Sequence, residues 1–198
     1  MKNIIPEDTR YVPMTQQKLC CVPTSISIIM YRHGIPLLPQ ELLGYHLGLI
    51  APEEDRGLFW NVRTGEKPEA GYGTQQEAEK YNLNTILQRV GIPLRAMEYP
   101  VGDFETESEL LTFLTERIGA GKDILVRFDS GTINGTGRCV GHVCVIDVTY
   151  PEKNTVRFIE TLPDYPKWRE VTTQLLFEAL HNHPTNNGVV WELEKIEL

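Results

Sequence analysis

The sequence predicts an α+β fold in which an N-terminal helical part packs on an antiparallel β-sheet from the C-terminal part. Apolar residues recur at helical spacing up to about residue 118. After Gly119-Ala120-Gly121 the pattern changes to short runs rich in valine and isoleucine, of which 140–149 is the longest. A chain of 198 residues can bury one full hydrophobic core, so we expect a single domain over 1–198.

The first helix is expected over 22–33. Its residues are apolar around most of the circumference, which indicates that the helix is buried. Pro23 suits the first helical turn, because its missing N–H costs nothing there, and Gly34 ends the helix.

Three further helices are expected before the first strand, over 39–47, 74–90 and 107–118. Thr74 and Glu77 have the spacing of a capping box at the start of the second of these. The connection 51–72 is rich in Pro, Gly and mixed charges, and a connection this long usually has a function of its own. Its Trp60 either covers a bound substrate or anchors the connection to the body.

The C-terminal part is expected to contain strands at 124–128, 140–149, 155–160 and 188–193, with a helix at 173–181. Residues 151–154 make a turn, so the strands on either side of it should pair as a hairpin. Helices therefore come first and strands later, which is typical of an α+β fold with a segregated antiparallel sheet.

Composition excludes several classes of function. The net charge is −8, from 19 basic and 27 acidic residues, which argues against binding to nucleic acid or to an anionic membrane surface. The apolar runs are too short to span a membrane, and the first residues do not resemble a signal peptide. The four cysteines are therefore expected to be reduced thiols in a cytoplasmic protein.

The strongest chemical signal is Cys21, at the start of the first helix. Unpaired backbone N–H groups and the positive end of the helix dipole favour a thiolate there. If a histidine lies opposite, the thiolate can act as a nucleophile. His142 lies in the strand 140–149, and Glu160 ends the strand that returns from it.

These residue types fit the hydrolysis of an amide. The thiolate attacks a carbonyl, the imidazole protonates the leaving amine, and an acid fixes the orientation of the imidazole. Gln16 and Gln17 lie just upstream of the thiol, and either amide could stabilise the oxyanion.

Three motifs resemble those of the C39-like family of papain-like cysteine peptidases. Tyr11-Val12-Pro13-Met14-Thr15-Gln16 is similar to a Val-Pro-x-x-x-Gln stretch, with the glutamine one place early unless Gln17 is the match. Cys21-Val22-Pro23-Thr24-Ser25 is similar to Cys-Gly-Pro-(Thr/Ala)-Ser, with Gly34 at the helix end. Gly141-His142-Val143-Cys144-Val145 is similar to the Gly-His motif, and Glu160-Thr161 stands where the family has Asp-Pro. Residues 36–120 carry little of the resemblance.

The resemblance implies a papain-like fold, in which the nucleophile helix packs on an antiparallel sheet. It selects Cys21 rather than Cys20 as the nucleophile. The sequence departs from the family pattern where Val22 replaces a glycine and where Glu160 replaces aspartate or asparagine. Asp164 is the alternative third residue, and Gln16 is narrowly preferred to Gln17 as the oxyanion donor.

Simpler interpretations exist for each residue. A free cysteine is most often a small buried apolar residue, and this is the interpretation for Cys20. Cys144 should share a strand face with His142 without taking part in the reaction. The other histidines lie near predicted helix ends, where they would interact with the helix dipole or with solvent; they are His33, His46, His181 and His183.

A zinc site is an alternative to the catalytic interpretation, because cysteine and histidine side chains are common zinc ligands. The chain has no Cys-x-x-Cys pair, and Cys139 and Cys144 should point to opposite faces of one strand. We therefore expect no metal and no organic cofactor.

The sequence thus predicts a cysteine-nucleophile hydrolase that cleaves peptide or other amide bonds through a thioester acyl-enzyme. An acyl or amide transferase with the same Cys-His site is one alternative. A non-catalytic binding module with the same fold is the other, and it is suggested by Val22 and Glu160. The expected partner is a peptide or amide substrate, and the sequence does not predict an oligomeric state.

Overall fold

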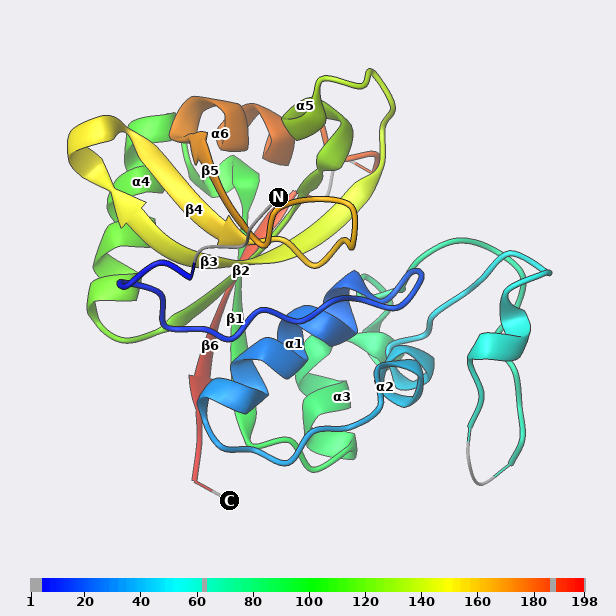
Figure 1. The fold of residues 1–198 in the computed structure, drawn as a ribbon. Helices are drawn as coiled ribbons and strands as arrows, with labels where there is room; N and C mark the ends of the chain where they lie inside the picture. The colour runs from blue at the N-terminus through cyan, green and yellow to red at the C-terminus, as the bar shows by residue number, and fades with distance from the viewer. Residues whose placement is uncertain (1–4, 62–63, 186–187, 198) are drawn as a thin grey trace.

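A computed structural model describes residues 5–61, 64–185 and 188–197. These residues form one six-stranded sheet in the order β1-β6-β2-β3-β4-β5, and each neighbouring pair is antiparallel (Figure 1). The strands are β1 Leu94–Pro100, β2 Asp123–Asp129, β3 Gly141–Tyr150, β4 Thr155–Ile159, β5 Trp168–Thr172 and β6 Val189–Lys195. The helices are α1 Cys21–Arg32, α2 Gln40–His46, α3 Leu83–Arg89, α4 Glu107–Gly119, α5 Ser130–Asn134 and α6 Thr173–His181.

The sheet separates two apolar clusters. α1, α2 and α3 lie on one side of it, and α4 and α6 lie on the other (Figure 1). Neighbouring residues of a strand face opposite sides, so Leu125 belongs to the cluster around α1 and Val126 to the cluster around α4 and α6. The α1 helix is buried from Val22 to Met30, which places its N-terminal residue Cys21 where the helix emerges from the core.

Most of the predicted elements are confirmed. α1, α2, α4 and α6 begin and end within one residue of the predicted positions. β2, β3, β4 and β6 lie within two residues of theirs, and β3 and β4 pair as the predicted hairpin. The α+β fold class is therefore correct.

The helix predicted over 74–90 is wrong in its first half. α3 begins only at Leu83, and Asn82 caps it by accepting a hydrogen bond from the backbone N–H of Asn84 at 3.0 Å. Thr74 and Glu77 do not form a capping box, because the Glu77 carboxylate binds Arg127 instead. Their spacing has the pattern of a helix start, but tertiary contacts hold the backbone in turns.

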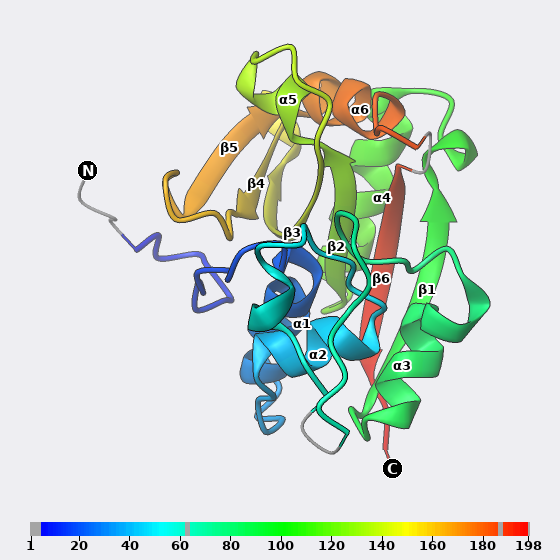
Figure 2. The ribbon, with the colours of Figure 1, turned by 90° about the vertical axis from the view of Figure 1, so that its right-hand side faces the viewer.

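Three elements were not predicted: β1, β5 and α5. β1 pairs with β6 over its whole length, although the two strands are far apart in the chain (Figure 2). The order of helices first and strands later is therefore only approximate, because β1 precedes α4, and α5 and α6 lie between strands.

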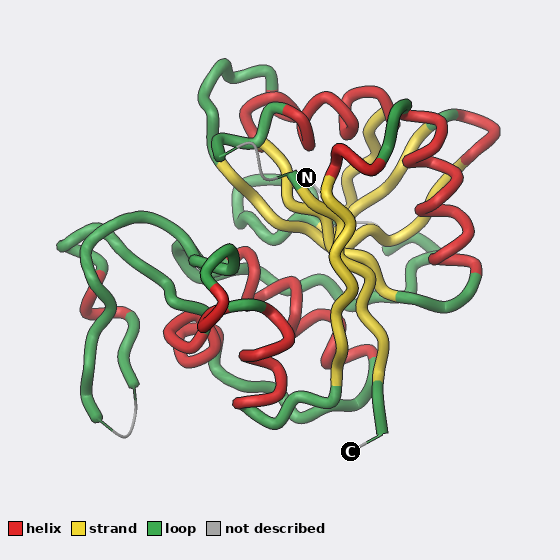
Figure 3. Tube along the Cα trace, turned by 180° about the vertical axis from the view of Figure 1, so that it is seen from behind, coloured by secondary structure: helices red, strands yellow, loops and turns green. Residues whose placement is uncertain are grey.

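The connection 51–72 leaves the body and returns to nearly the same place (Figures 1 and 3). Isolated bridges pair Ile50 with Gly73 and Ala51 with Ala70, and they close its base. Phe59 is fully buried against Leu19 and Cys20, whereas Trp60 is 46% exposed. Phe59 rather than Trp60 therefore anchors the connection; Val62 lies outside the described residues.

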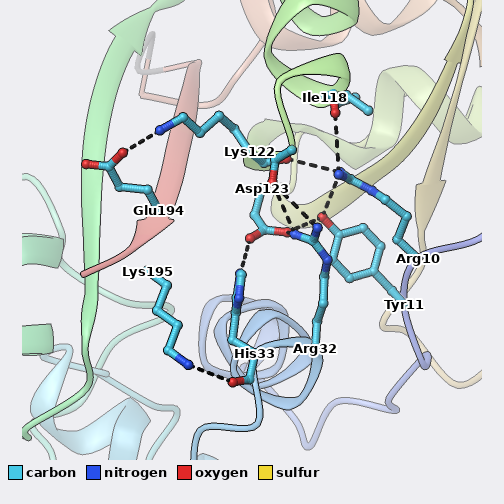
Figure 4. A network of polar contacts seen from close by, with 10 residues as sticks. Arg10, Tyr11, Arg32, His33, Ile118, Lys122, Asp123, Glu194 and Lys195 are labelled. Atoms are coloured by element: carbon cyan, nitrogen blue, oxygen red, sulfur yellow. Dashed lines mark hydrogen bonds and ion pairs between the residues drawn. The ribbon is translucent and has the colours of Figure 1, made fainter. Parts of the chain in front are cut away.

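A buried carboxylate fixes the far end of α1 (Figure 4). Asp123, at the start of β2, accepts a hydrogen bond of 2.5 Å from the Tyr11 hydroxyl and forms an ion pair with Arg32. The Nε2 atom of His33 lies 2.6 Å from the same carboxylate. His33 thus lies at the end of the helix, as expected, and additionally contacts a buried carboxylate that the sequence did not indicate. Through these contacts the C-terminal end of α1 is held against the sheet.

Within the described ranges, no helix has both the length and the apolar character needed to cross a bilayer.

Candidate functional site

Cys21 is the first residue of α1, and its side chain is half-buried. The N–H groups of a first helical turn have no partner within the helix, so they can stabilise a thiolate or an oxyanion. The preceding Leu19 has a φ of +65°, an uncommon conformation for a bulky residue. This left-handed residue, two positions before the thiol, turns the chain toward the helix, and Cys20 between them is fully buried, as expected.

His142, the second residue of β3, is buried beside Glu160, which directly follows β4. The Nε2 atom of His142 lies 2.7 Å from Oε1 of Glu160. The backbone N–H of Leu162 donates to the same oxygen at 3.0 Å, and Arg169 binds the other oxygen at 3.1 Å. Asp164, the alternative third residue, is exposed. The structure thus brings Glu160 to the imidazole.

Burial alone would raise the pKa of Glu160. Its hydrogen bond with His142, the charge of that imidazolium and the bonds from Leu162 and Arg169 outweigh burial and lower the pKa to about 2. The carboxylate therefore stays ionised at neutral pH. It is available to stabilise a positive charge on the imidazole.

Burial alone would lower the pKa of His142. Its interactions with the thiols of Cys144 and Cys21 and with the Glu160 carboxylate raise the pKa well above its usual range. Because Glu160 occupies Nε2, the other ring nitrogen, Nδ1, is the one that can face a thiol. Cys21, His142 and Glu160 thus form one connected set of side chains.

Gln16 lies beside this set. Its side-chain oxygen accepts a hydrogen bond of 2.6 Å from the Thr161 hydroxyl, and its backbone N–H donates to the Thr161 carbonyl at 2.8 Å. The amide nitrogen is then the atom of the side chain that can donate to an oxyanion. Gln17 is exposed, and its backbone N–H donates to the side chain of Gln40. The geometry places Gln16, not Gln17, in the site.

A cleft of about 400 Å³ contains the thiol and the imidazole. This is the size of pocket that encloses a small ligand or a few residues of a peptide. Its lining includes four residues already described, Gln16, Leu19, Cys21 and His142. Tyr72 also lines the cleft, whereas Trp60 is not among the described residues that do so.

Cys144 is the buried neighbour of this site, and its sulfur lies 4.0 Å from Oε1 of Glu160. Burial raises the pKa of the Cys144 thiol to about 11. The expectation that Cys144 shares a face with His142 is therefore confirmed. His142, Cys144 and Glu160 are also close enough together to hold a metal ion. However, Oε1 of Glu160 is engaged by His142 and by the backbone N–H of Leu162, and Oε2 is engaged by Arg169, so the cluster fits an acid–imidazole pair better than a cation site.

His183 was expected to interact with a helix dipole or with solvent; it lies two residues beyond the end of α6, but it is not solvated. It is buried and lines the cleft, with its ring directly against Gly141. The pKa of His183 falls to about 4, mainly because of burial and secondarily because of the charge of Arg127. Gln76 and Arg127 line the same part of the cleft, and sequence reasoning singled out neither. A polar sequence such as His181-Asn182-His183 gives no signal of burial.

Comparisons with known proteins find similarity at the level of the fold. No family model and no curated protein sequence matches the chain. The fold is similar to the crystal structure of a provisionally assigned C39-like peptidase from Bacillus anthracis, with a TM-score of 0.52 and 13% sequence identity. The match covers 94% of this chain and 96% of the other. The protein thus shares an α+β fold with that C39-like structure along nearly its whole length.

Proposed function

We propose that the protein is a cysteine-nucleophile hydrolase that cleaves peptide or other amide bonds. The observation that carries this proposal is the convergence of Cys21, His142 and Glu160 at one cleft, with the amide of Gln16 beside them. The similarity of the fold to a C39-like structure agrees with it. The resemblance of the sequence motifs to that family is a further, independent support.

The reaction follows from the roles of these groups. The Cys21 thiolate, paired with the imidazolium of His142, attacks the carbonyl carbon of the substrate. The negative charge that develops on the carbonyl oxygen is stabilised by the amide of Gln16 and by the backbone N–H of Cys21. His142 then donates its proton to the leaving amine, and a thioester with Cys21 remains.

Hydrolysis of the thioester completes the cycle. His142, now neutral, accepts a proton from water as the water attacks the thioester carbonyl. Glu160 stays ionised throughout and keeps the imidazole oriented. No step uses a metal or an organic cofactor. The expected partner is a peptide or amide substrate in the cytoplasm rather than a nucleic acid or a membrane.

The first test is alkylation of the native protein by iodoacetamide between about pH 5 and 9, mapped by mass spectrometry. We expect Cys21 to react quickly well below pH 8 and to lose this reactivity in His142→Ala. Free N-acetylcysteine added to the same reaction serves as the reference for an ordinary thiol. If Cys21 reacts no faster than this reference, the proposal fails and a non-catalytic binding module becomes the better interpretation.

The second test is turnover. Hydrolysis of a library of fluorogenic peptide amides should be detectable in the wild type and abolished in Cys21→Ala. Addition of a free amine to the assay then separates hydrolase from transferase, because a transferase gives the new amide as its product.

A further inference from the structure

One wall of the cleft carries polar groups that the proposed reaction does not use. They come from three separate segments and include Gln76, Arg127 and His183. Gln76 is the most informative of them. It is only 7% exposed, and its amide nitrogen is buried without an acceptor within the described residues. Because an unsatisfied buried donor is costly, a ligand that supplies an acceptor would be stabilised there.

Arg127 places a buried positive charge at the same wall. Arg127 belongs to β2 and is 7% exposed. Its guanidinium stacks over the ring of Trp191, with 5.1 Å between the guanidinium carbon and the ring centroid. Burial lowers the pKa of Arg127, whereas the carboxylates of Glu77 and Glu98, and to a smaller extent Cys21, raise it. Arg127 and Cys21 line the same cleft, so the guanidinium borders the space that a substrate of Cys21 would occupy.

The contact between Glu77 and Arg127 shows that the guanidinium binds a carboxylate at this wall. The Glu77 carboxylate lies 2.5 Å from Nη1 of Arg127, although its side chain is 44% exposed. Glu77 directly follows Gln76, in a turn that borders the cleft. A carboxylate supplied by the chain itself thus already lies on the guanidinium at the cleft wall. An exposed group in a turn can be displaced by a competing ligand more readily than a buried one.

His183 is the third polar residue of the wall, and its ring carries no charge near pH 7. Its Nδ1 atom lies 3.2 Å from the hydroxyl of Thr185, and its Nε2 side lies against Gly141. A side chain at position 141 would place its Cβ 2.7 Å from Nε2, so glycine is required for the ring to lie there. The lowered pKa keeps the ring neutral near pH 7. Among the described residues that line the cleft, the groups charged near pH 7 at this wall are therefore Arg127 and its partner Glu77.

We propose that Gln76 and Arg127 form a specificity subsite that binds a carboxylate of the substrate, namely an acidic side chain close to the amide bond that is cleaved. A carboxylate accepts hydrogen bonds from an amide and from a guanidinium at once, and charge-assisted bonds are the stronger ones. The inference rests on the proposed function, because it assumes that the substrate reacts at Cys21. Gln76 and Arg127 act as binding residues, and Glu77 competes with the substrate for Arg127.

The experiment uses three electrophiles that differ only in one side chain: the bromoacetyl derivatives of glutamate amide, glutamine amide and leucine amide. Each alkylates a thiol by displacement of bromide. The second-order rate constant at Cys21 is measured by mass spectrometry at neutral pH. We expect the glutamate probe to react about tenfold faster than the glutamine probe, which corresponds to about 1.4 kcal/mol.

Three variants locate the source of this selectivity. Gln76→Leu should reduce the preference for glutamate severalfold, because it removes the amide donor. Arg127→Lys should have a similar effect, because an ammonium group cannot bind a carboxylate through two parallel N–H bonds as a planar guanidinium does. Glu77→Gln should increase the preference, because it removes the competing carboxylate. Gln88→Leu, at an exposed position of α3, is the matched control and should leave the ratio unchanged. Circular dichroism confirms that each variant is folded.

The outcomes separate this proposal from the proposed function. If iodoacetamide reacts quickly at Cys21 but the three probes react at equal rates, the subsite is disproved while the enzyme proposal survives. A preference that persists in Gln76→Leu also overturns the assignment. If Cys21 is unreactive, binding of acetyl-glutamate amide and acetyl-glutamine amide to Cys21→Ala is compared by calorimetry. Equal affinities in that experiment reject the subsite, and a preference for glutamate that is lost in the Cys21→Ala/Gln76→Leu double variant supports it.

Discussion

The side chain of Gln16 accepts a hydrogen bond of 2.6 Å from the hydroxyl of Thr161. Thr161 directly follows Glu160 in the chain, so the segment that holds the acid also orients the glutamine. The backbone bond between the same two residues, at 2.8 Å, joins the N-terminal segment to the end of β4. The proposed oxyanion donor and the proposed acid are therefore positioned by one local structure.

Replacing Thr161 with valine should lower kcat about tenfold. The variant keeps the shape of the side chain but loses the donor that fixes Gln16, so the amide can rotate away from the oxyanion. The rate of alkylation of Cys21 by iodoacetamide should change little, because that reaction forms no oxyanion. Thr112→Val, on the exposed side of α4, is the control. An equal loss in both assays would indicate that Thr161 acts on the thiol instead.

Replacing Glu160 with glutamine should move the alkaline limit of activity to lower pH. The imidazolium of His142 is required for the reaction, and its pKa is raised in part by Glu160. Without the carboxylate this pKa falls, so the imidazolium is lost at a lower pH. The alkaline limb of the profile of kcat/KM against pH reports this change. An unchanged limb would show that Glu160 does not interact with the catalytic imidazole.

Glu160 should also make folding sensitive to acid. Its pKa is about 2 in the folded protein and near 4.5 in the unfolded chain, so its stabilising effect is complete above pH 4.5 and is lost as the pH falls toward 2. The full loss amounts to roughly 3 kcal/mol in the free energy of unfolding, and roughly 2 kcal/mol of it falls between pH 6 and pH 3. Urea titrations of the wild type at pH 6 and pH 3 measure this part. Glu160→Gln should show a smaller difference between the two pH values.

The four cysteines should divide into two pairs on labelling at pH 8. Cys20 and Cys144 are fully buried, and burial raises the pKa of Cys20 to about 12 and of Cys144 to about 11. Both should stay unmodified until the protein unfolds, because the thiolate is the reactive form. Cys21 and Cys139 are accessible and should react in the native state. Peptide mapping with and without urea tests this, and native labelling of Cys144 would contradict the described packing.

Replacing Asp123 with asparagine should destabilise the protein by about 2–4 kcal/mol. The carboxylate is buried and holds Tyr11, Arg32 and His33, so the variant leaves buried donors and positive charge without their partner. The midpoint of urea unfolding measures the effect, and Asp103→Asn is the exposed control. A loss below 1 kcal/mol would show that the network contributes little net stability.

The parts of the fold that could be predicted are those whose signal is local. α1 follows from the closely spaced apolar residues between Pro23 and Gly34, and the β3–β4 hairpin follows from a valine-rich run, a turn and a second β-prone run. β1 has no such signal. It ends in Pro100 and is only partly buried, and it forms because β6, nearly a hundred residues later, offers it a full set of hydrogen bonds.

The candidate site divides in the same way. Cys21, His142 and Glu160 lie in short motifs, so their types and order indicate a chemistry before any geometry is known. Gln76, Arg127 and His183 lie in unrelated polar or strand sequences. They become a group only because the fold buries them together at one cleft. The choice of Gln16 over Gln17 likewise depends on a hydrogen bond with a residue 145 positions away.

Two bridges hold the ends of the connection 51–72 next to each other, so the residues between them form a loop that leaves and rejoins the body at one place. Since its ends meet, its length and sequence can change in related proteins without moving α1 or the strands that carry His142 and Glu160. Phe59 is the anchoring side chain that any such change must keep. A change in this loop could therefore alter which substrate reaches the cleft, while Cys21, His142 and Glu160 keep their positions.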